Sequence, residues 1–212
     1  PESPDWGSTI NAGRKLLTAA RIAARRLPDG LPPVLYLTDP SRTPDPATTV
    51  AQLPAGWGVV YRHFGHARIT DTAIRITEAA RKSHVRVLIA DDPHLAAAVG
   101  ADGVHWPFAH RHEARRWRDR FALMTASAHS LKQLQQLQDT GVDAALLSTA
   151  FPSRSPSAGA PLGPVRFRAI AQRATIAVYA LGGLTAGTAA MLAPVAGIAA
   201  IDGIETVFGP RT

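Results

Sequence analysis

Polar residues suited to proton transfer and anion binding follow several of the short apolar runs in this chain. His129 follows residues 122–128 in the stretch SAHS, and an ordinary imidazole both accepts and donates protons near neutral pH. Arg62 stands in the otherwise apolar or aromatic run GVVYRHF, where a buried guanidinium needs an anionic partner. Gly182 and Gly183 open a turn before an expected helix, and backbone N–H groups in such turns hold phosphate. These residues predict a proton-transfer site for an anionic ligand.

Each of these residues also has a purely structural interpretation. His129 would then be a capping or core histidine, Arg62 one half of a surface ion pair, and the Gly-Gly step a plain turn. Asp91 and Asp92 carry carboxylates that suit a divalent metal. Asp92 equally suits the N-cap of a helix that follows it. Residue types alone leave both interpretations open.

Secondary structure must bring these residues together. Residues 85–106 read as a strand, a polar turn, a short Ala-rich helix, a glycine stop and a second strand, which is a βαβ unit with parallel strands. Eight such β-rich runs occur, mostly separated by helical segments, so we predict a single-domain (β/α)8 TIM barrel. The strands are expected to start near Val34, Gly58, Val85, Ala101, Ala122, Asp143, Ile176 and Ile198.

In such a barrel the carboxyl ends of the strands carry the chemistry. The glycine pair follows the seventh strand, a place where barrels often bind phosphate. The polar and glycine residues at the predicted strand ends are Asp39, Arg62, His63, Asp91, Asp92, His105, Ser127, His129, Ser148, Thr149, Gly182, Gly183 and Asp202.

Four segments depart from the regular alternation. Residues 8–26 form an extra N-terminal helix, so we divide the chain into residues 1–30, a helix and linker, and residues 31–209, the barrel. Residues 41–54 are rich in Pro and Thr and are predicted to be mostly loop, with at most one helical turn. Residues 110–121 are predicted to be one helix. The eighth strand is expected over residues 198–204, which leaves too little chain for a full last helix. The N-terminal helix would then cover that gap or the barrel bottom.

Composition narrows the class of protein. The 212 residues are 46% hydrophobic and contain no cysteine, which excludes disulfides and thiolate chemistry. No signal-peptide pattern and no apolar run of about 18 residues occurs, so we expect a soluble cytoplasmic protein. The net charge is +7. The arginines of residues 110–120 are interpreted as a solvated helix face without interleaved aromatic rings, so neither a nucleic-acid nor a membrane partner is expected.

The chain resembles the thiamine-phosphate synthase/TenI family over roughly residues 34–204. The segments LYLTDP, LIADDPHLAAAVGADGVHW, SAHS, AFPSRS and ALGGL carry the resemblance, in the same order along the barrel. It implies a role in thiamine biosynthesis and a small phosphorylated thiazole ligand. The synthase of this family joins a hydroxymethylpyrimidine diphosphate to a thiazole phosphate with the help of Mg2+.

The diphosphate and metal clamp of the synthase is only partly present. The family's Gln-x-Arg-x-Lys stretch retains Arg62 but has Phe64 in place of the lysine. Its Asn-Asp pair appears as Ala90 and Asp91, and its second metal-binding aspartate falls at His110. Each lost cation or carboxylate weakens binding of the diphosphate and Mg2+.

This chain retains more of the family's residues at the remaining phosphate-binding positions. The family's Thr-x-Thr-Lys loop appears as Ser153, Ser155 and Pro156, which loses a second lysine. The serine before the histidine is kept as Ser127, and the paired glycines are kept as well. Asp91, Ser127, Ser153 and Ser155 are therefore predicted to contact the substrate.

The incomplete clamp resembles the TenI branch, which implies a thiazole tautomerase that needs no metal. The resemblance makes His129 the proton shuttle, Arg62 the partner of the ligand carboxylate, and Gly182 and Gly183 the phosphate site. Two alternatives stay open. One is a divergent thiamine-phosphate synthase with Mg2+ at Asp91, and the other is a non-catalytic regulatory or ligand-binding homologue. A homo-oligomer is not excluded.

Overall fold

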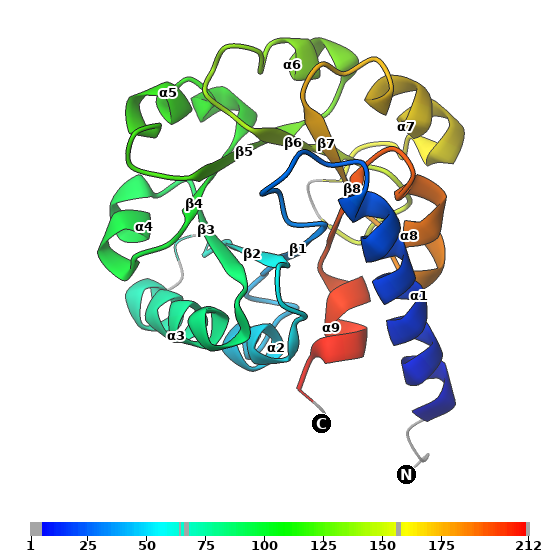
Figure 1. Cartoon of the computed structure of the whole chain (residues 1–212), viewed down its shortest axis with the longest axis horizontal. Coiled ribbons are helices and arrows are strands. Elements are labelled where there is room, and N and C mark those ends of the chain that lie inside the picture. The colour runs from blue at the N-terminus through cyan, green and yellow to red at the C-terminus, as the bar shows by residue number, and fades with distance from the viewer. Residues whose placement is uncertain (1–5, 64, 66–67, 156–157, 211–212) are drawn as a thin grey trace.

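The protein is a closed barrel of eight parallel strands, in the order β1 to β8, with β8 pairing back to β1. The computed structural model describes residues 6–63, 65, 68–155 and 158–210. Figure 1 shows the strands at the centre, surrounded by the helices. The predicted single-domain (β/α)8 fold is confirmed.

The strands begin within two residues of their predicted starts. They are β1 Val34–Leu37, β2 Gly58–Tyr61, β3 Arg86–Ala90, β4 Gly103–Trp106, β5 Leu123–Ala128, β6 Ala144–Ser148, β7 Ala177–Leu181 and β8 Gly197–Ala200. The helices are α1 Trp6–Ala24, α2 Pro46–Gln52, α3 Ile69–Ser83, α4 Pro93–Val99, α5 Glu113–Trp117, α6 Leu131–Gln135, α7 Gly163–Ala171, α8 Ala186–Leu192 and α9 Asp202–Phe208, with a 3-10 turn over Phe108–His110. In the described part of the chain, no helix is long and apolar enough to cross a bilayer.

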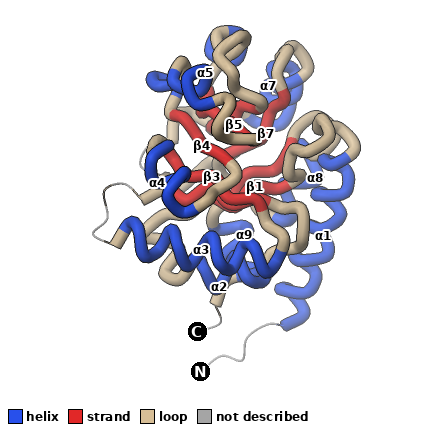
Figure 2. The backbone as a smooth tube through the Cα atoms, turned by 60° about the vertical axis from the view of Figure 1, so that its left-hand side comes forward, coloured by secondary structure: helices blue, strands red, loops and turns tan. Residues whose placement is uncertain are grey.

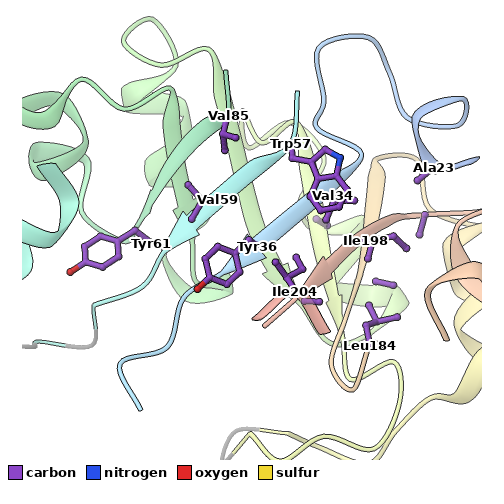
Figure 3. Close-up of a cluster of buried hydrophobic side chains, with 14 of the residues drawn as sticks. Ala23, Val34, Tyr36, Trp57, Val59, Tyr61, Val85, Leu184, Ile198 and Ile204 are labelled. Carbon is purple, nitrogen blue, oxygen red and sulfur yellow. The ribbon is translucent and has the colours of Figure 1, made fainter. Parts of the chain in front are cut away.

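Alternate residues of each strand face two separate hydrophobic clusters. In β1, Leu35 and Leu37 point into the barrel, while Val34 and Tyr36 point outward against the helices. Figure 2 shows the strands enclosed by the layer of helices. Figure 3 shows part of the outer cluster, where Tyr36 lies beside Ile204 of α9. Both faces of the strands are buried, so polar side chains are left to the strand ends.

The ends of the chain differ in part from the sequence prediction. β8 stops at Ala200, and α9 begins at Asp202, so the last βα unit contains a short helix where residues 198–204 were predicted as strand. The N-terminal helix α1 packs beside α8, β8 and α9 (Figure 1). It lies against the last βα unit and does not replace the helix of that unit, which is α9. The ring of Trp57 contacts Phe208 of α9 edge-on, at a centroid distance of 5.5 Å.

Two further predictions about helices are wrong. Residues 41–54 contain α2, a helix of seven residues with Pro46 in its first turn and a buried face that includes Val50. Residues 110–121 do not form one helix, because the 3-10 turn and α5 are separate and short. Ala114 and Phe121 are nevertheless buried there, and Arg115 and Arg116 are exposed as predicted.

Candidate active site at the barrel mouth

The side chain of Arg62 lines three cavities at the carboxyl ends of the strands in the described part of the chain. The first, about 310 Å³, is formed by the loops after β6, β7 and β8, and we call it the glycine cavity. The second, also about 310 Å³, contains His63 and His105 and is called the histidine cavity. The third, about 100 Å³, lies against α2. The predicted mouth of the barrel therefore contains three cavities that share one arginine.

The glycine cavity owes its shape to a close approach of two loops. Gly182 and Gly183 both have positive φ, 100° and 64°, which glycine adopts without strain. A Cβ on Gly183 would lie 2.2 Å from the carbonyl oxygen of Pro152, so glycine allows the loop after β6 to lie on this turn. The loop brings Ser153 and Ser155 to the same cavity. With Arg62, five predicted substrate-binding residues thus line one cavity.

Arg62 is a partly buried cation held at the end of β1. Its Nε donates to the carbonyl oxygen of Thr38 at 2.8 Å, and its NH2 lies 3.8 Å from a carboxylate oxygen of Asp39. Burial lowers the pKa of Arg62 to about 10, and the Asp39 charge partly opposes this shift. The guanidinium therefore remains charged at neutral pH and faces the cavities.

Asp39 organises the loop that follows β1. Its carboxylate accepts hydrogen bonds from the hydroxyl of Ser41 at 2.6 Å and from Arg42 at 2.9 Å. Burial alone would raise the pKa of Asp39, but these hydrogen bonds and the Arg42 charge lower it to about 2. The ionised carboxylate fixes Arg42 at the rim of the glycine cavity.

His105 forms a hydrogen-bonded chain across β4 and β5. Its Nδ1 lies 2.9 Å from Thr125 Oγ1, and its Nε2 lies 3.0 Å from Ser127 Oγ. Burial, with a contribution from the nearby Arg62 charge, lowers the pKa of His105 to about 3. The imidazole is therefore neutral at neutral pH, with one nitrogen donating and the other accepting. Ser127 lines the histidine cavity with its hydroxyl oriented by His105.

His129 is exposed and has a partner that the sequence did not predict. Its Nδ1 lies 3.0 Å from Ser148 Oγ, and Ser148 lines the glycine cavity. The neighbouring serines have other partners, since Ser127 contacts His105 and Ser130 caps α6 by accepting from the Gln133 N–H. His129 thus lies at the edge of the glycine cavity, one hydroxyl away from it.

The carboxylate of Asp91 is hydrogen-bonded to an imidazole. The Nδ1 of His110 lies 2.8 Å from Asp91 Oδ1, and this hydrogen bond and the carboxylate charge raise the pKa of His110. Asp92 caps α4 by accepting from the Leu95 N–H at 2.8 Å, so its structural interpretation is confirmed. Mg2+ prefers several oxygen ligands. No three His, Asp or Glu side chains come together for a metal in the described residues, so this arrangement does not fit the ion.

The remaining mouth residues include two arginines that were not predicted. Arg42 and Arg154 line the glycine cavity with Asp202 and Thr149, whereas His63 lines the histidine cavity. The sequence gives no signal for either arginine, because each lies in a loop whose course depends on distant partners. Phe64 and Pro156, where the family has lysines, lie outside the described residues.

Comparison with known proteins identifies the family. The family model for thiamine monophosphate synthase, TMP-TENI, matches residues 38–204. A thiamine-phosphate synthase of Chloroflexus aurantiacus is 31% identical over 151 residues, or 68% of each chain. One of Geobacillus thermodenitrificans is 27% identical over 206 residues, which cover 91% of this chain and 92% of that protein.

A bifunctional relative agrees with this assignment, and a solved structure shows the same fold. The thiamine biosynthesis bifunctional protein ThiM/ThiE of Symbiobacterium thermophilum is 32% identical over 183 residues, and this chain spans only 37% of its length. The solved structure of a thiamine phosphate pyrophosphorylase from Pyrococcus furiosus has the same fold, with a TM-score of 0.70 at 21% identity over 84% of this chain and 91% of that chain. The match over residues 38–204 places this chain in the thiamine monophosphate synthase (TMP-TENI) family.

Proposed function

We propose that this chain is an enzyme of thiamine biosynthesis that binds a thiazole phosphate in the glycine cavity. Family membership supports the class of ligand. The lining of the cavity supports the phosphate, because it combines the backbone of Gly182 and Gly183 with the guanidinium groups of Arg42, Arg62 and Arg154. Arginine and backbone N–H groups are common phosphate ligands in proteins.

We propose proton transfer, namely thiazole tautomerisation, as the reaction. The observation that carries this proposal is the 2.8 Å pair of His110 and Asp91. A synthase would need two carboxylates for Mg2+. This chain has one at that place, Asp91, and its carboxylate is already hydrogen-bonded to the imidazole of His110. Tautomerisation releases no diphosphate and requires no such charge to be neutralised.

In this mechanism His129 moves a proton between a carbon and a nitrogen of the bound thiazole. Its Nδ1 faces Ser148, so Nε2 is the nitrogen left to exchange the proton with the ligand. Arg62 pairs with the ligand carboxylate at the base of the cavity. An imidazole can both accept and donate a proton, as the two halves of the transfer require.

The synthase reaction is the second candidate, and the names of the curated relatives favour it over the tautomerase. In that reaction the histidine cavity, with Ser127 and Arg62 in its wall, would receive the pyrimidine. Asp91 would first have to leave His110 to become a metal ligand.

One assay separates the candidates. Purified protein is incubated with the thiazole carboxylate phosphate tautomer, with and without hydroxymethylpyrimidine diphosphate and Mg2+. We expect isomerisation that is insensitive to EDTA. Formation of thiamine phosphate at about 1 per second or faster would instead establish the synthase. If neither product forms but thiazole phosphate binds, the chain is a ligand-binding homologue.

A further inference from the structure

A carboxylate of the protein stands inside the glycine cavity between two arginines. Asp202, the first residue of α9, lines the cavity. Its Oδ2 lies 3.0 Å from Arg154 NH2 and 3.6 Å from Arg42 NH1. Arg154 comes from the loop after β6 and Arg42 from the loop after β1, so this carboxylate joins three loops across the mouth.

Local packing fixes the position of Asp202. The next residue, Gly203, lies so close to the turn after β7 that a Cβ there would be 2.4 Å from the carbonyl oxygen of Leu184. The backbone oxygen of Asp202 also accepts from the Thr206 hydroxyl at 2.7 Å. The start of α9 is therefore held against the same turn that contains Gly182 and Gly183, with its carboxylate directed at the arginines.

We propose that Asp202 is an internal competitor for the phosphate of the ligand. This inference rests on the proposed function in one respect, the assignment of the glycine cavity as the phosphate site. In the free protein the Asp202 carboxylate pairs with Arg154 and lies 3.6 Å from Arg42, which Asp39 also holds. When a phosphomonoester binds, Arg154 turns to it, Arg42 contacts it from its place beside Asp39, and Asp202 is released toward solvent.

The charges of the cavity favour this exchange. Three arginines and one aspartate line it, and a phosphate dianion offers more charge and more acceptor oxygens than one carboxylate. Asp202 has a side-chain exposure of 41% and Arg154 of 82%, so both can reorient without opening the fold. Asp202 thereby lowers phosphate affinity and makes Arg42 and Arg154 binding residues of the site.

Calorimetric titration with inorganic phosphate tests the proposal. We expect Asp202→Asn to bind phosphate about tenfold tighter than the unmodified protein, because a like charge leaves the cavity. The matched control is Glu113→Gln on α5. Its pair with Arg116 has the same 3.0 Å separation and side-chain exposures of 42% and 75%, but Glu113 does not line the glycine cavity. The control should bind phosphate as the unmodified protein does.

Three more variants complete the test. Arg154→Gln should weaken phosphate binding, and the double variant with Asp202→Asn should lose the gain of the single variant. Asp202→Ser removes the same charge and serves if the asparagine variant does not fold. Unchanged or weaker phosphate binding on removal of the Asp202 charge would overturn the proposal. Inorganic phosphate contains no thiazole, so failure of the tautomerase assay and failure of this competition are separate results.

Discussion

Two histidines at the mouth of the barrel differ in their surroundings and therefore in their chemistry. His105 is buried and neutral between two hydroxyl groups, which suits orientation of Ser127. His129 is exposed and has a single side-chain hydrogen bond to Ser148 in the described residues, which leaves its second nitrogen for a ligand. Of these two histidines, His129 is therefore the one placed to exchange a proton with a ligand.

The residue His129 provides the first prediction. His129→Asn keeps polarity but cannot shuttle a proton, so we expect tautomerisation to fall about 100-fold or more, the usual range for general acid–base catalysis. Turnover is measured on the thiazole tautomer. The control is His112→Asn, an exposed histidine beside α5, which should not change turnover. A normal rate for His129→Asn would make His129 a structural residue.

The residue His105 provides a prediction about acid stability. Its folded pKa of about 3 lies below the ordinary value near 6.5. Below about pH 6.5, His105 is therefore protonated in the unfolded chain but still neutral in the folded chain. The contribution of His105 to the free energy of unfolding is therefore fully present above about pH 6.5 and is lost as the pH falls toward 3. His105→Gln should lower stability at pH 7.5 yet lose less of it between pH 6.5 and 4.

Urea unfolding at several pH values measures this dependence. The control is His129→Asn, whose exposed imidazole should leave the slope of stability against pH as in the unmodified protein. An equal slope in the His105→Gln variant would show that His105 does not carry the acid sensitivity.

At the scale of elements, the turn after β7 controls the loop after β6. Gly183→Ala would place a Cβ 2.2 Å from the Pro152 carbonyl oxygen at a φ of 64°, so the loop with Ser153 and Ser155 must move. We expect thiazole phosphate affinity to fall about tenfold, the effect of roughly 1.4 kcal/mol.

The matched control is Gly187→Ala in α8. A Cβ at Gly187 would lie 3.7 Å from the Thr185 hydroxyl, which is ordinary contact, and alanine favours the helix by about 1 kcal/mol. Thiazole phosphate affinity should be unchanged and the melting temperature slightly higher. Unchanged affinity in Gly183→Ala, measured by the same calorimetry, would remove this turn from the phosphate site.

The elements also show which features a sequence can predict. Strand positions were predictable because short β-rich runs, separated by turn residues and helices, mark both ends of a buried parallel strand. α2 was missed because Pro and Thr favour loops in isolation, whereas burial of Pro46 and Val50 stabilises this helix. α9 was missed because the apolar run 197–204 does not reveal that the chain turns at Ile201.

The candidate site was predictable to a smaller extent for a related reason. Gly182 and Gly183 carry a backbone signal, and the cavity contains them as expected. The partners of Ser127, Asp91 and His129 come from neighbouring strands or loops, and such pairs depend on the register between strands, for which a single sequence has no signal. His105 was a candidate only by its position at a strand end.

At the scale of the whole molecule, a buried polar cluster joins the first and last parts of the barrel. The hydroxyl of Tyr36 in β1 donates to Glu205 of α9, and Thr49 of α2 donates to the same oxygen at 3.0 Å. Burial raises the pKa of Glu205, although these two hydrogen bonds oppose it. An ionised Glu205 therefore costs stability, and this cost grows as the pH rises through its folded pKa.

Glu205→Gln retains the acceptor oxygen and removes the charge. We expect its melting temperature to exceed that of the unmodified protein by about 2–4 °C at pH 7.5, the shift for roughly 1 kcal/mol in a domain of this size. The difference should shrink at pH 4, where Glu205 is protonated. Thermal unfolding followed by circular dichroism measures both values. A lower melting temperature at pH 7.5 would show that the charged form of Glu205 stabilises the fold.

The pairing of β1 with β8 has a consequence for how this chain folds during synthesis. Val34 pairs with Ile198 and Tyr36 with Ala200, so the two strands that close the sheet are separated by most of the chain. Until residues 197–208 leave the ribosome, β1 and β7 each present an unpaired edge, and α1 lacks the β8 and α9 surfaces that it covers. Open edges of this kind invite pairing with other chains. The nascent chain therefore completes its barrel only once β8 and α9 have been synthesised, and it is most prone to aggregation just before that point.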